Sequence, residues 1–268
     1  MPRAIWSGPI SFGLVNVPVK LYTAAASRDV AFHQLRESDG SRIQQRRFAV
    51  SDGEEVTTDE LVKGYEVSPG RHVMITNEEL ESLRPKGTQG IEIEEFVDLT
   101  EIDPVYFEKS YYLVPDKGAA KPYALLRAAM QQANKVGLGR VVMRNKQYVA
   151  AIRPAGNALS LATLYLADEV VPQSALDELP DPETELSERE LSMAEQLITM
   201  LSNHFAPEQY TDDYRKKLME LIEAKAAGEE VVFQPQEDQP TKVVDLMAAL
   251  QASIDAAKAN RAAEQKTG

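Results

Sequence analysis

The sequence of 268 residues contains no cysteine, only three histidines and a single tryptophan. Without cysteine the chain can form no disulfide, hold no cysteine-ligated zinc and use no thiol nucleophile. Three histidines leave few imidazole groups for catalysis or for metal binding. We therefore expect neither a metal site nor a cofactor, and we interpret each histidine as an ordinary surface or core residue.

Long apolar runs are also missing. The uncharged N-terminal stretch 4–19 is interrupted by glycine and proline, which a secretion signal avoids. The alternation of Val15, Val17, Val19 and Leu21 with polar residues and a proline has the period of a strand instead. We therefore expect a cytoplasmic protein with no membrane partner. Its 43% hydrophobic residues are enough for a globular core.

The formal charge of −13, from 29 basic and 42 acidic side chains, argues against nucleic-acid binding when taken as a whole. The charge is unevenly distributed. Residues 1–50 carry a net +4, 51–110 a net −11, 111–160 a net +7 and 161–268 a net −13. Asp116 is the only acid in the third segment. Basic blocks thus alternate with acidic ones, and the total charge conceals them.

Short strands dominate the predicted structure up to residue 167. A helix over Pro122–Val136, ended by Gly137, interrupts them, with Leu125 and Leu126 on its apolar face. Arg144-Asn145-Lys146 is typical of a hairpin turn. This pattern favours an α+β protein with a β-barrel or sandwich over a doubly wound sheet. The expected strands are Ile5–Phe12, Leu14–Tyr22, Ile91–Glu94, Tyr106–Val114, Arg140–Met143, Gln147–Arg153 and Ala158–Ala167.

The last third predicts amphipathic helices. Ser187 and Glu190 have capping-box spacing and open a helix over about 188–203, and Thr211 is the expected cap of a second over about 212–227. A Pro-bounded polar linker follows at 234–240. The expected apolar stripes are Leu191, Ala194, Leu197, Ile198 and Leu201; Tyr214, Leu218, Leu221 and Ile222; and Val243, Leu246, Met247, Leu250 and Ile254.

Enzymatic motifs are weak. Gly137-Leu138-Gly139 lacks the third glycine of a dinucleotide loop and lies between a helix and a strand, the reverse of the required order. Asp116–Lys121 is not a Walker A sequence, and no nucleophile elbow occurs. We therefore expect no enzyme. A metabolic enzyme on an acidic α+β scaffold remains the alternative, and an adaptor that uses its C-terminal helices is a third.

Basic side chains offer a better candidate site. Guanidinium groups match phosphate oxygens in geometry and stay charged at every physiological pH. No short helix with base-reading polar residues accompanies them, so phosphate contacts would bind DNA of any sequence. The candidate DNA-binding residues are Lys20, Arg28, Arg36, Arg42, Arg46, Arg47, Arg140, Arg144 and Lys146.

The sequence resembles bacterial Ku through motifs that run in family order over nearly the whole chain. The opening, AIWSGPISFGLVNVPVKLY at 4–22, is the longest of them. The others are His33–Gln34, Asp39–Ile43, Val62–Glu66, Glu94–Val97, Phe107–Leu113, Pro122–Leu126, Leu191–Ala194 and Asp245–Leu250.

The resemblance implies a protein that binds double-stranded DNA ends in non-homologous end joining. It implies a homodimer whose two β-barrels and arms, here about 28–75, form a ring around the duplex. It also implies nucleoid association and recruitment of a multifunctional ATP-dependent DNA ligase. Only the ring's lining then needs basic residues. We place the core domain at 1–233, including helices at about 187–228, and the linker and C-terminal helix at 234–268.

Two departures from the family qualify this expectation. Many bacterial relatives have cysteines just after the basic cluster of the arm, where this chain has Phe48–Gly53, so we expect no zinc. Some relatives also carry a long lysine-rich tail, which this sequence lacks. Functions attributed to such tails are therefore not expected here.

Overall fold

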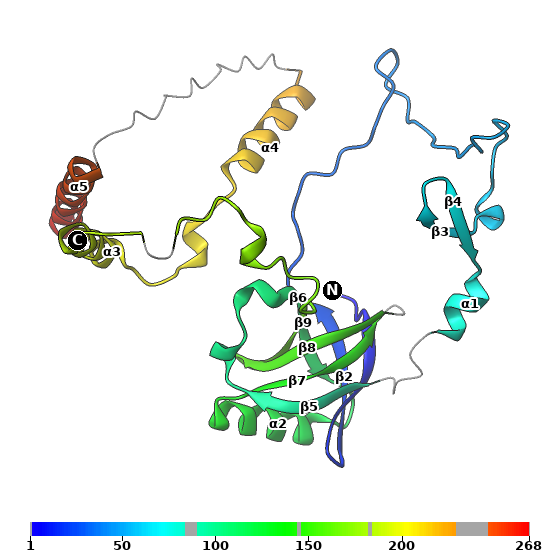
Figure 1. Cartoon of the computed structure of the whole chain (residues 1–268), viewed down its shortest axis with the longest axis horizontal. Helices are drawn as coiled ribbons and strands as arrows, with labels where there is room; N and C mark the ends of the chain where they lie inside the picture. The colour runs from blue at the N-terminus through cyan, green and yellow to red at the C-terminus, as the bar shows by residue number, and fades with distance from the viewer. Residues whose placement is uncertain (1, 84–89, 144–145, 182–183, 229–245, 268) are drawn as a thin grey trace. The chain divides into compact units, whose positions relative to one another are not determined.

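The computed structural model describes all residues except 1, 84–89, 144–145, 182–183, 229–245 and 268 (Figure 1). The chain forms two compact units, Met1–Ala175 and Leu176–Gly268. The strands are β1 Trp6–Phe12, β2 Val15–Thr23, β3 Lys63–Ser68, β4 Arg71–Ile75, β5 Ile91–Val97, β6 Phe107–Pro115, β7 Val136–Met143, β8 Lys146–Ala155 and β9 Ala158–Leu164. The α-helices are α1 Asn77–Ser82, α2 Ala120–Ala133, α3 Glu188–Leu201, α4 Asp213–Ala226 and α5 Leu246–Thr267.

Seven strands close into a barrel in the order β1-β2-β6-β9-β8-β7-β5. All neighbours are antiparallel except β1 and β5, which pair in parallel at Ile10↔Ile91 and close the sheet. Closure leaves the sheet no free edge. The predicted barrel is therefore confirmed. So is the predicted hairpin β7–β8, although residues 144–145 of its turn lie outside the described part, and the two strands predicted at the N-terminus pair as a further hairpin, β1–β2.

The barrel encloses the main hydrophobic core. Along β2, Val17, Val19 and Leu21 are at most 1% exposed while Asn16 and Pro18 face outward, as the period of two predicts. Every strand of the barrel contributes to the core, and a smaller cluster around Val136, Ala151 and Leu164 extends it. The first unit thus contains a core of its own.

Helix α2 packs on the barrel through a face that differs from the predicted one. Tyr123, Leu126 and Met130 are buried, whereas Leu125 is 69% exposed. The helix also ends earlier than predicted, because Asn134 takes the left-handed conformation (φ 52°) as its C-cap and β7 starts at Val136. Apolar residues occur on two faces of this helix, so its sequence pattern alone could not select the buried one.

The tyrosine of α2 ties three segments together. The Tyr123 hydroxyl donates a hydrogen bond to the Leu113 carbonyl (2.6 Å) and accepts one from the Leu159 amide (2.7 Å). Burial raises the pKa of Tyr123, so the hydroxyl stays protonated and can donate. The side chain therefore joins α2 to β6 and β9 inside the core.

The glycine pair that resembled part of a dinucleotide loop lies inside β7. A Cβ atom on Gly139 would lie 2.0 Å from the Glu92 backbone oxygen, beside the bulge between Ile93 and Glu95 in β5. The glycine is therefore explained by the close approach of two strands.

Residues 24–83 connect β2 to the segment before β5 and include the arm predicted at about 28–75; from here on the whole connection is called the arm. The arm contains isolated bridges at Leu35↔Arg42 and Phe48↔Glu55, a separate β3–β4 hairpin and helix α1. The sequence reading missed β3, β4 and α1. Between Ala24 and Leu83 no residue is buried, so nothing in the arm's own packing favours a single regular hairpin.

The second unit is helical, and its capping differs in part from the prediction. Ser187 and Glu190 form the predicted capping box of α3. Helix α4 is capped by Asp212, whose side chain accepts from the Arg215 amide (2.9 Å), and not by Thr211. Gly228 follows its end with a positive φ of 79°. The predicted linker and the boundary at 233/234 lie outside the described residues, so that boundary stays a prediction.

Helices α3 and α5 pack against each other within this unit. Ile254 of α5 is 2% exposed, and Met193, Leu197 and Met200 of α3 are half-buried. The predicted α3 and α4 stripes are partly wrong, because four of their members are more than half exposed: Leu191, Ile198, Leu201 and Tyr214. Among the described residues, no helix is both long enough and apolar enough to cross a membrane.

Candidate nucleic-acid interface

Five of the nine candidate DNA-binding residues lie in the arm, and all five are exposed: Arg28, Arg36, Arg42, Arg46 and Arg47. They do not lie on a regular strand. Two tight turns carry four of them, and each turn is held by backbone hydrogen bonds. Their side chains are therefore not placed by the regular alternation of a β-strand.

The first turn brings two arginines close together. The Arg36 amide donates to the Ser41 carbonyl (2.8 Å), and Arg42 bridges back to Leu35. The Arg36 guanidinium binds the Asp39 carboxylate through both of its oxygens, with Nε at 3.0 Å from Oδ1. That hydrogen bond lowers the pKa of Asp39 to about 2. Arg36 is therefore held by an anion, whereas Arg42 is not.

The second turn holds the adjacent pair of arginines. The Val56 amide donates to the Arg47 carbonyl (2.9 Å), and the Arg46 guanidinium lies 2.9 Å from Glu55 Oε2. An open cavity of about 850 Å³ lies here, lined by polar side chains from both sides of the turn: Gln44, Gln45, Arg46, Arg47, Glu55, Thr57 and Thr58, together with Val56. Its amide, hydroxyl and guanidinium groups can donate to phosphate oxygens.

Two candidates on the barrel are paired with acids. Lys20 of β2 lies 2.7 Å from Asp116, and their contact raises the pKa of Lys20 and lowers that of Asp116. Arg140 of β7 donates to Glu94 of β5 at 2.7 Å. Both pairs are accessible to solvent, which screens their attraction, so they contribute little to stability.

The β7–β8 hairpin carries the remaining two. Lys146 lies 3.6 Å from Glu169 and 5.2 Å from the ring centre of Tyr148. Arg144 lies outside the described residues. The hairpin therefore presents at least one ammonium group beside an aromatic ring, an arrangement that also occurs in nucleic-acid contacts.

Ion pairing divides the candidates into two groups. Lys20, Arg36, Arg46, Arg140 and Lys146 each have an acidic partner. Within the described part of the chain, Arg28, Arg42 and Arg47 have none. An exposed pair is weak and screened by salt, so a phosphate can replace the acid. We nevertheless expect the strongest phosphate attraction at the three unpaired arginines.

The structure adds two basic residues that the sequence reading did not select. Lys63 and Arg71 lie on the β3–β4 hairpin of the arm, are exposed and form no ion pair among the described residues. They were missed because segment 51–110 is strongly acidic as a whole. Their position inside the expected arm was the feature of the sequence that could have identified them.

Pairs of adjacent glutamates at 54–55, 78–79 and 94–95 are exposed, and one member of each pair has a specific partner. Glu55 pairs with Arg46, Glu94 pairs with Arg140, and Glu79 closes the capping box of α1 with Thr76. The acidic blocks therefore neutralise specific basic residues and cap a helix.

The residues that the structure describes include no cluster of metal ligands. Among those described, no three histidine, aspartate or glutamate side chains gather in a way that could hold a metal ion. His33, His72 and His204 are all exposed. We find no observation that favours the alternative of a metabolic enzyme.

Comparison with known proteins matches this architecture. A family described as "Ku70/Ku80 beta-barrel domain" matches residues 11–193. A "Non-homologous end joining protein Ku" of Anaeromyxobacter sp. is 51% identical over 96% of this chain and 87% of its own. Proteins with the same name from Archaeoglobus fulgidus and Frankia casuarinae are 41% and 46% identical, over 100% and 66% of their lengths.

These matches span the barrel, the arm and most of the helical unit. Identities of 40% and above over more than nine-tenths of the chain exceed what a shared fold alone would require. With a closed seven-stranded barrel in the matched region, the chain belongs to the Ku family of non-homologous end joining proteins.

Proposed function

We propose that this chain binds double-stranded DNA ends of any sequence as a ring-shaped homodimer, protects them, and recruits and stimulates an ATP-dependent DNA ligase. The DNA-end function rests on membership of the Ku family, whose relatives carry the name of non-homologous end joining. We place this activity at the nucleoid. The candidate DNA-binding residues remain part of the proposal.

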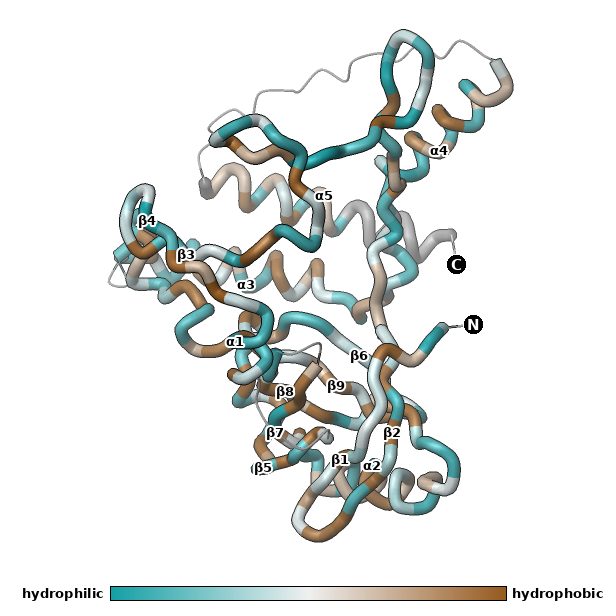
Figure 2. Tube along the Cα trace, turned by 90° about the vertical axis from the view of Figure 1, so that its right-hand side faces the viewer, coloured by the Kyte–Doolittle hydropathy of each residue, from teal (hydrophilic) through white to brown (hydrophobic). Residues whose placement is uncertain are grey.

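The exposure of the arm is the observation that supports a ring-shaped dimer. From Ala24 to Leu83 no residue is buried, although the arm contains many large apolar side chains, and apolar segments recur along it in Figure 2. The most exposed include Phe32 at 69%, Tyr65 at 67%, Met74 at 72% and Val50. Ordering a residue costs about 1–2 kcal/mol of backbone entropy, and burial normally offsets it. A second copy of the chain and a duplex would supply that burial.

Independence of sequence follows from the chemistry of the arm. Its turns present guanidinium, amide and hydroxyl groups, which contact phosphates, and they contain no helix that could enter the major groove and read bases. Binding of this kind releases counterions, so affinity falls steeply as salt rises. A closed ring would also retain DNA because the duplex is threaded through it. An acidic outer surface would then not prevent binding.

The helical unit is our candidate for ligase recruitment. Residues 161–268 carry a net −13, so phosphate repels this region and leaves it to a protein partner. Phe205 and Tyr210 are 80% and 74% exposed, and their rings lie 5.8 Å apart. Exposed aromatic side chains of this kind are common in protein interfaces. We propose the region only and name no individual ligase contact.

Competition between linear and circular DNA tests the proposal. A labelled linear duplex is bound, and unlabelled linear or covalently closed circular DNA of the same sequence is added at the same salt. We expect the linear DNA to compete and the circle to fail, while light scattering gives the mass of a dimer. Equal competition by the circle would overturn end-threading, and a monomeric mass would overturn the ring.

Truncation from Gln234 tests the placement of the boundary and of the ligase contact. Because a Pro-bounded linker precedes the last helix, we expect end binding to persist and ligase stimulation to fall. Loss of end binding by a folded, dimeric truncation would show that the C-terminal helix belongs to the clamp.

A further inference from the structure

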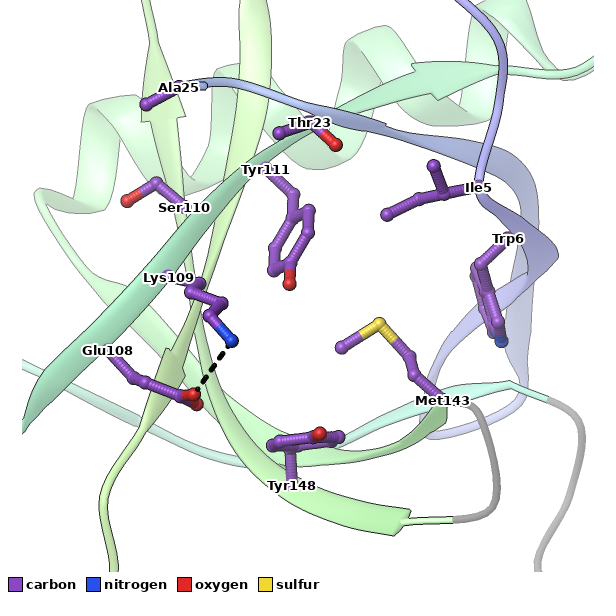
Figure 3. A pocket seen from close by; sticks show the side chains of 10 residues that line it. All are labelled: Ile5, Trp6, Thr23, Ala25, Glu108, Lys109, Ser110, Tyr111, Met143 and Tyr148. Carbon is purple, nitrogen blue, oxygen red and sulfur yellow. Dashed lines mark ion pairs between the residues drawn. The ribbon is translucent and has the colours of Figure 1, made fainter. Parts of the chain in front are cut away.

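The surface of the barrel is hollowed at one end and along one side. The cavity at the end has a volume of about 570 Å³ and lies where β1, β6 and β8 begin and β2 and β7 end (Figure 3). Trp6, Tyr111 and Tyr148 give it aromatic walls. The charged residues among its described lining are Lys109 and Glu108, which lie 3.3 Å apart. Their charges offset each other, so this cavity favours no charged ligand.

The side of the barrel carries two adjoining cavities of about 620 and 250 Å³ that share Leu99 and Arg153. We call the two together the Arg153 groove. One wall is the segment between β5 and β6, which contributes Ile102 and Pro104, and the opposite wall is the outer face of β6, β9 and β8. The smaller cavity continues the groove to the end of α2 and the turn between β8 and β9.

The register of the sheet gives this groove a floor of small side chains. Ser160 of β9 lies opposite Tyr112 of β6 on one side and opposite Arg153 of β8 on the other. Ser160 is buried, and Ala162 follows it on the same face. Because neighbouring strands lie about 4.8 Å apart, the backbones that carry Tyr112 and Arg153 are separated by about 10 Å. A single extended chain fits in a gap of that width.

The charge of the groove is positive. Arg153 is exposed, and its guanidinium has no ion pair within the part of the chain that the structure describes. Lys135 in the same lining lies 3.0 Å from Asp98, and Arg127 donates to the Gly156 carbonyl (2.7 Å) at the edge. The described lining of both cavities includes no acidic residue. The groove therefore attracts an anionic ligand to a chain whose net charge is −13.

The apolar walls select a peptide over a nucleic acid. Leu99 is 45% exposed and Tyr112 is 44% exposed, and Ile102 and Pro104 lie beside them in the lining. A phosphate backbone is bound by hydrogen-bond donors and gains little from aliphatic walls. A carboxylate side chain, in contrast, can form two parallel hydrogen bonds with one guanidinium. In an extended peptide, alternate side chains point in opposite directions, so carboxylates and apolar groups can reach different walls.

We propose that the Arg153 groove binds an extended acidic segment of a partner protein, with one carboxylate on Arg153 and apolar side chains against Leu99 and Tyr112. This surface lies on the barrel and is distinct from the helical region proposed for ligase recruitment. The inference goes beyond DNA-end binding and does not depend on it.

Two matched peptides test the chemistry of the groove. The whole protein is titrated into a short fluorescein-labelled peptide of alternating leucine and glutamate, and into the same peptide with glutamine in place of glutamate, and fluorescence anisotropy reports binding. We expect the glutamate peptide to bind about tenfold more tightly, because only a carboxylate pairs with the guanidinium. Attraction to the protein as a whole cannot produce this result, since the net charge of −13 repels an acidic peptide. Equal binding of both peptides, or binding of neither, would overturn the proposal.

A matched pair of arginine variants locates the binding. Arg153→Ala should weaken binding of the glutamate peptide about tenfold. Arg189→Ala should leave it unchanged, because Arg189 lies on α3, is exposed and also forms no ion pair among the described residues. Equal losses in the two variants, or no loss in Arg153→Ala, would contradict the assignment.

Mobility shifts with a linear duplex separate this proposal from the proposed function. We expect Arg153→Ala to bind the duplex as tightly as the unchanged protein. Loss of duplex binding by Arg153→Ala while the peptide still binds would assign Arg153 to a phosphate and overturn the peptide site. Failure of the unchanged protein to bind linear DNA would contradict the proposed function only, because the peptide titration is independent of it.

Discussion

The barrel and the arm are made from one unit of the chain, yet they are stabilised in opposite ways. In the barrel, residues such as Ile10, Leu113 and Leu161 are fully buried, and the sheet closes on itself. In the arm, apolar side chains of the same kinds are exposed, and only turns, one hairpin and one short helix order the backbone. The barrel carries its own hydrophobic core, whereas no residue of the arm is buried.

Truncating a core residue should produce the largest effect. Leu161→Ala, at a fully buried position, should lower the free energy of unfolding by about 2–5 kcal/mol. Phe48→Ala, at a position 59% exposed, should change it by less than about 0.5 kcal/mol and instead weaken self-association. Denaturant unfolding followed by Trp6 fluorescence, with sedimentation equilibrium, measures both. Similar losses of stability would show that the arm packs on the barrel.

Removing one buried hydroxyl should have an intermediate effect. Tyr123→Phe leaves the Leu113 carbonyl and the Leu159 amide without their partner and should cost about 1–3 kcal/mol. Tyr112→Phe is the control, because its ring is 44% exposed on the outside of β6. The same unfolding measurement applies. A neutral Tyr123→Phe would mean that water or other groups replace the hydroxyl.

Charge in the arm should affect DNA binding more than folding. Replacing Arg42 and Arg47 together by alanine should weaken binding of all sequences about tenfold and flatten the slope of log affinity against log salt by about two. The same change at Arg36 and Arg46, which already pair with acids, should do less. Mobility shifts over a salt series measure both. A larger loss of affinity in the Arg36 and Arg46 variant than in the Arg42 and Arg47 variant would show that the ion pairs do not mask charge.

A pH titration of the first arm turn should give the smallest effect. The folded pKa of Asp39 is about 2, below the ordinary value of 3.8, because Arg36 binds the carboxylate. The interaction therefore stabilises the turn fully above pH 3.8 and is lost as pH falls through about 2. Carboxyl NMR shifts should show this midpoint, and Arg36→Ala should raise it. An unchanged midpoint in the variant would assign the shift to the backbone alone.

Much of the architecture could be predicted from local patterns. Alternation at Val17, Val19 and Leu21 identified β2, and the spacing of Ser187 and Glu190 placed the start of α3. The family and the barrel were predicted from the resemblance to bacterial Ku, and the comparisons confirm both. Strands β3 and β4 and helix α1 of the arm were not predicted, because a segment without buried residues has no apolar period that would mark them.

The candidate site was less accessible to sequence reading. Its arginines were found from their type and clustering, but a distant acidic partner could not be, since Arg140 pairs with Glu94, 46 positions away. The aromatic cavity was also missed, because Trp6, Tyr111 and Tyr148 are distant in sequence and meet only where five strands reach one end of the barrel. No local spacing in the sequence indicates that these aromatic residues meet.

By itself, the sequence determined the positions of most barrel strands, the capping box of α3, the alternating charge blocks and the family. Each of these depends on residues within a few positions of one another or on ordered motifs. Only the tertiary structure decided which face of α2 is buried, that β1 and β5 close the barrel, and which basic residues are neutralised. These features depend on contacts between distant segments, which a local periodicity cannot select when apolar or charged residues occupy more than one face.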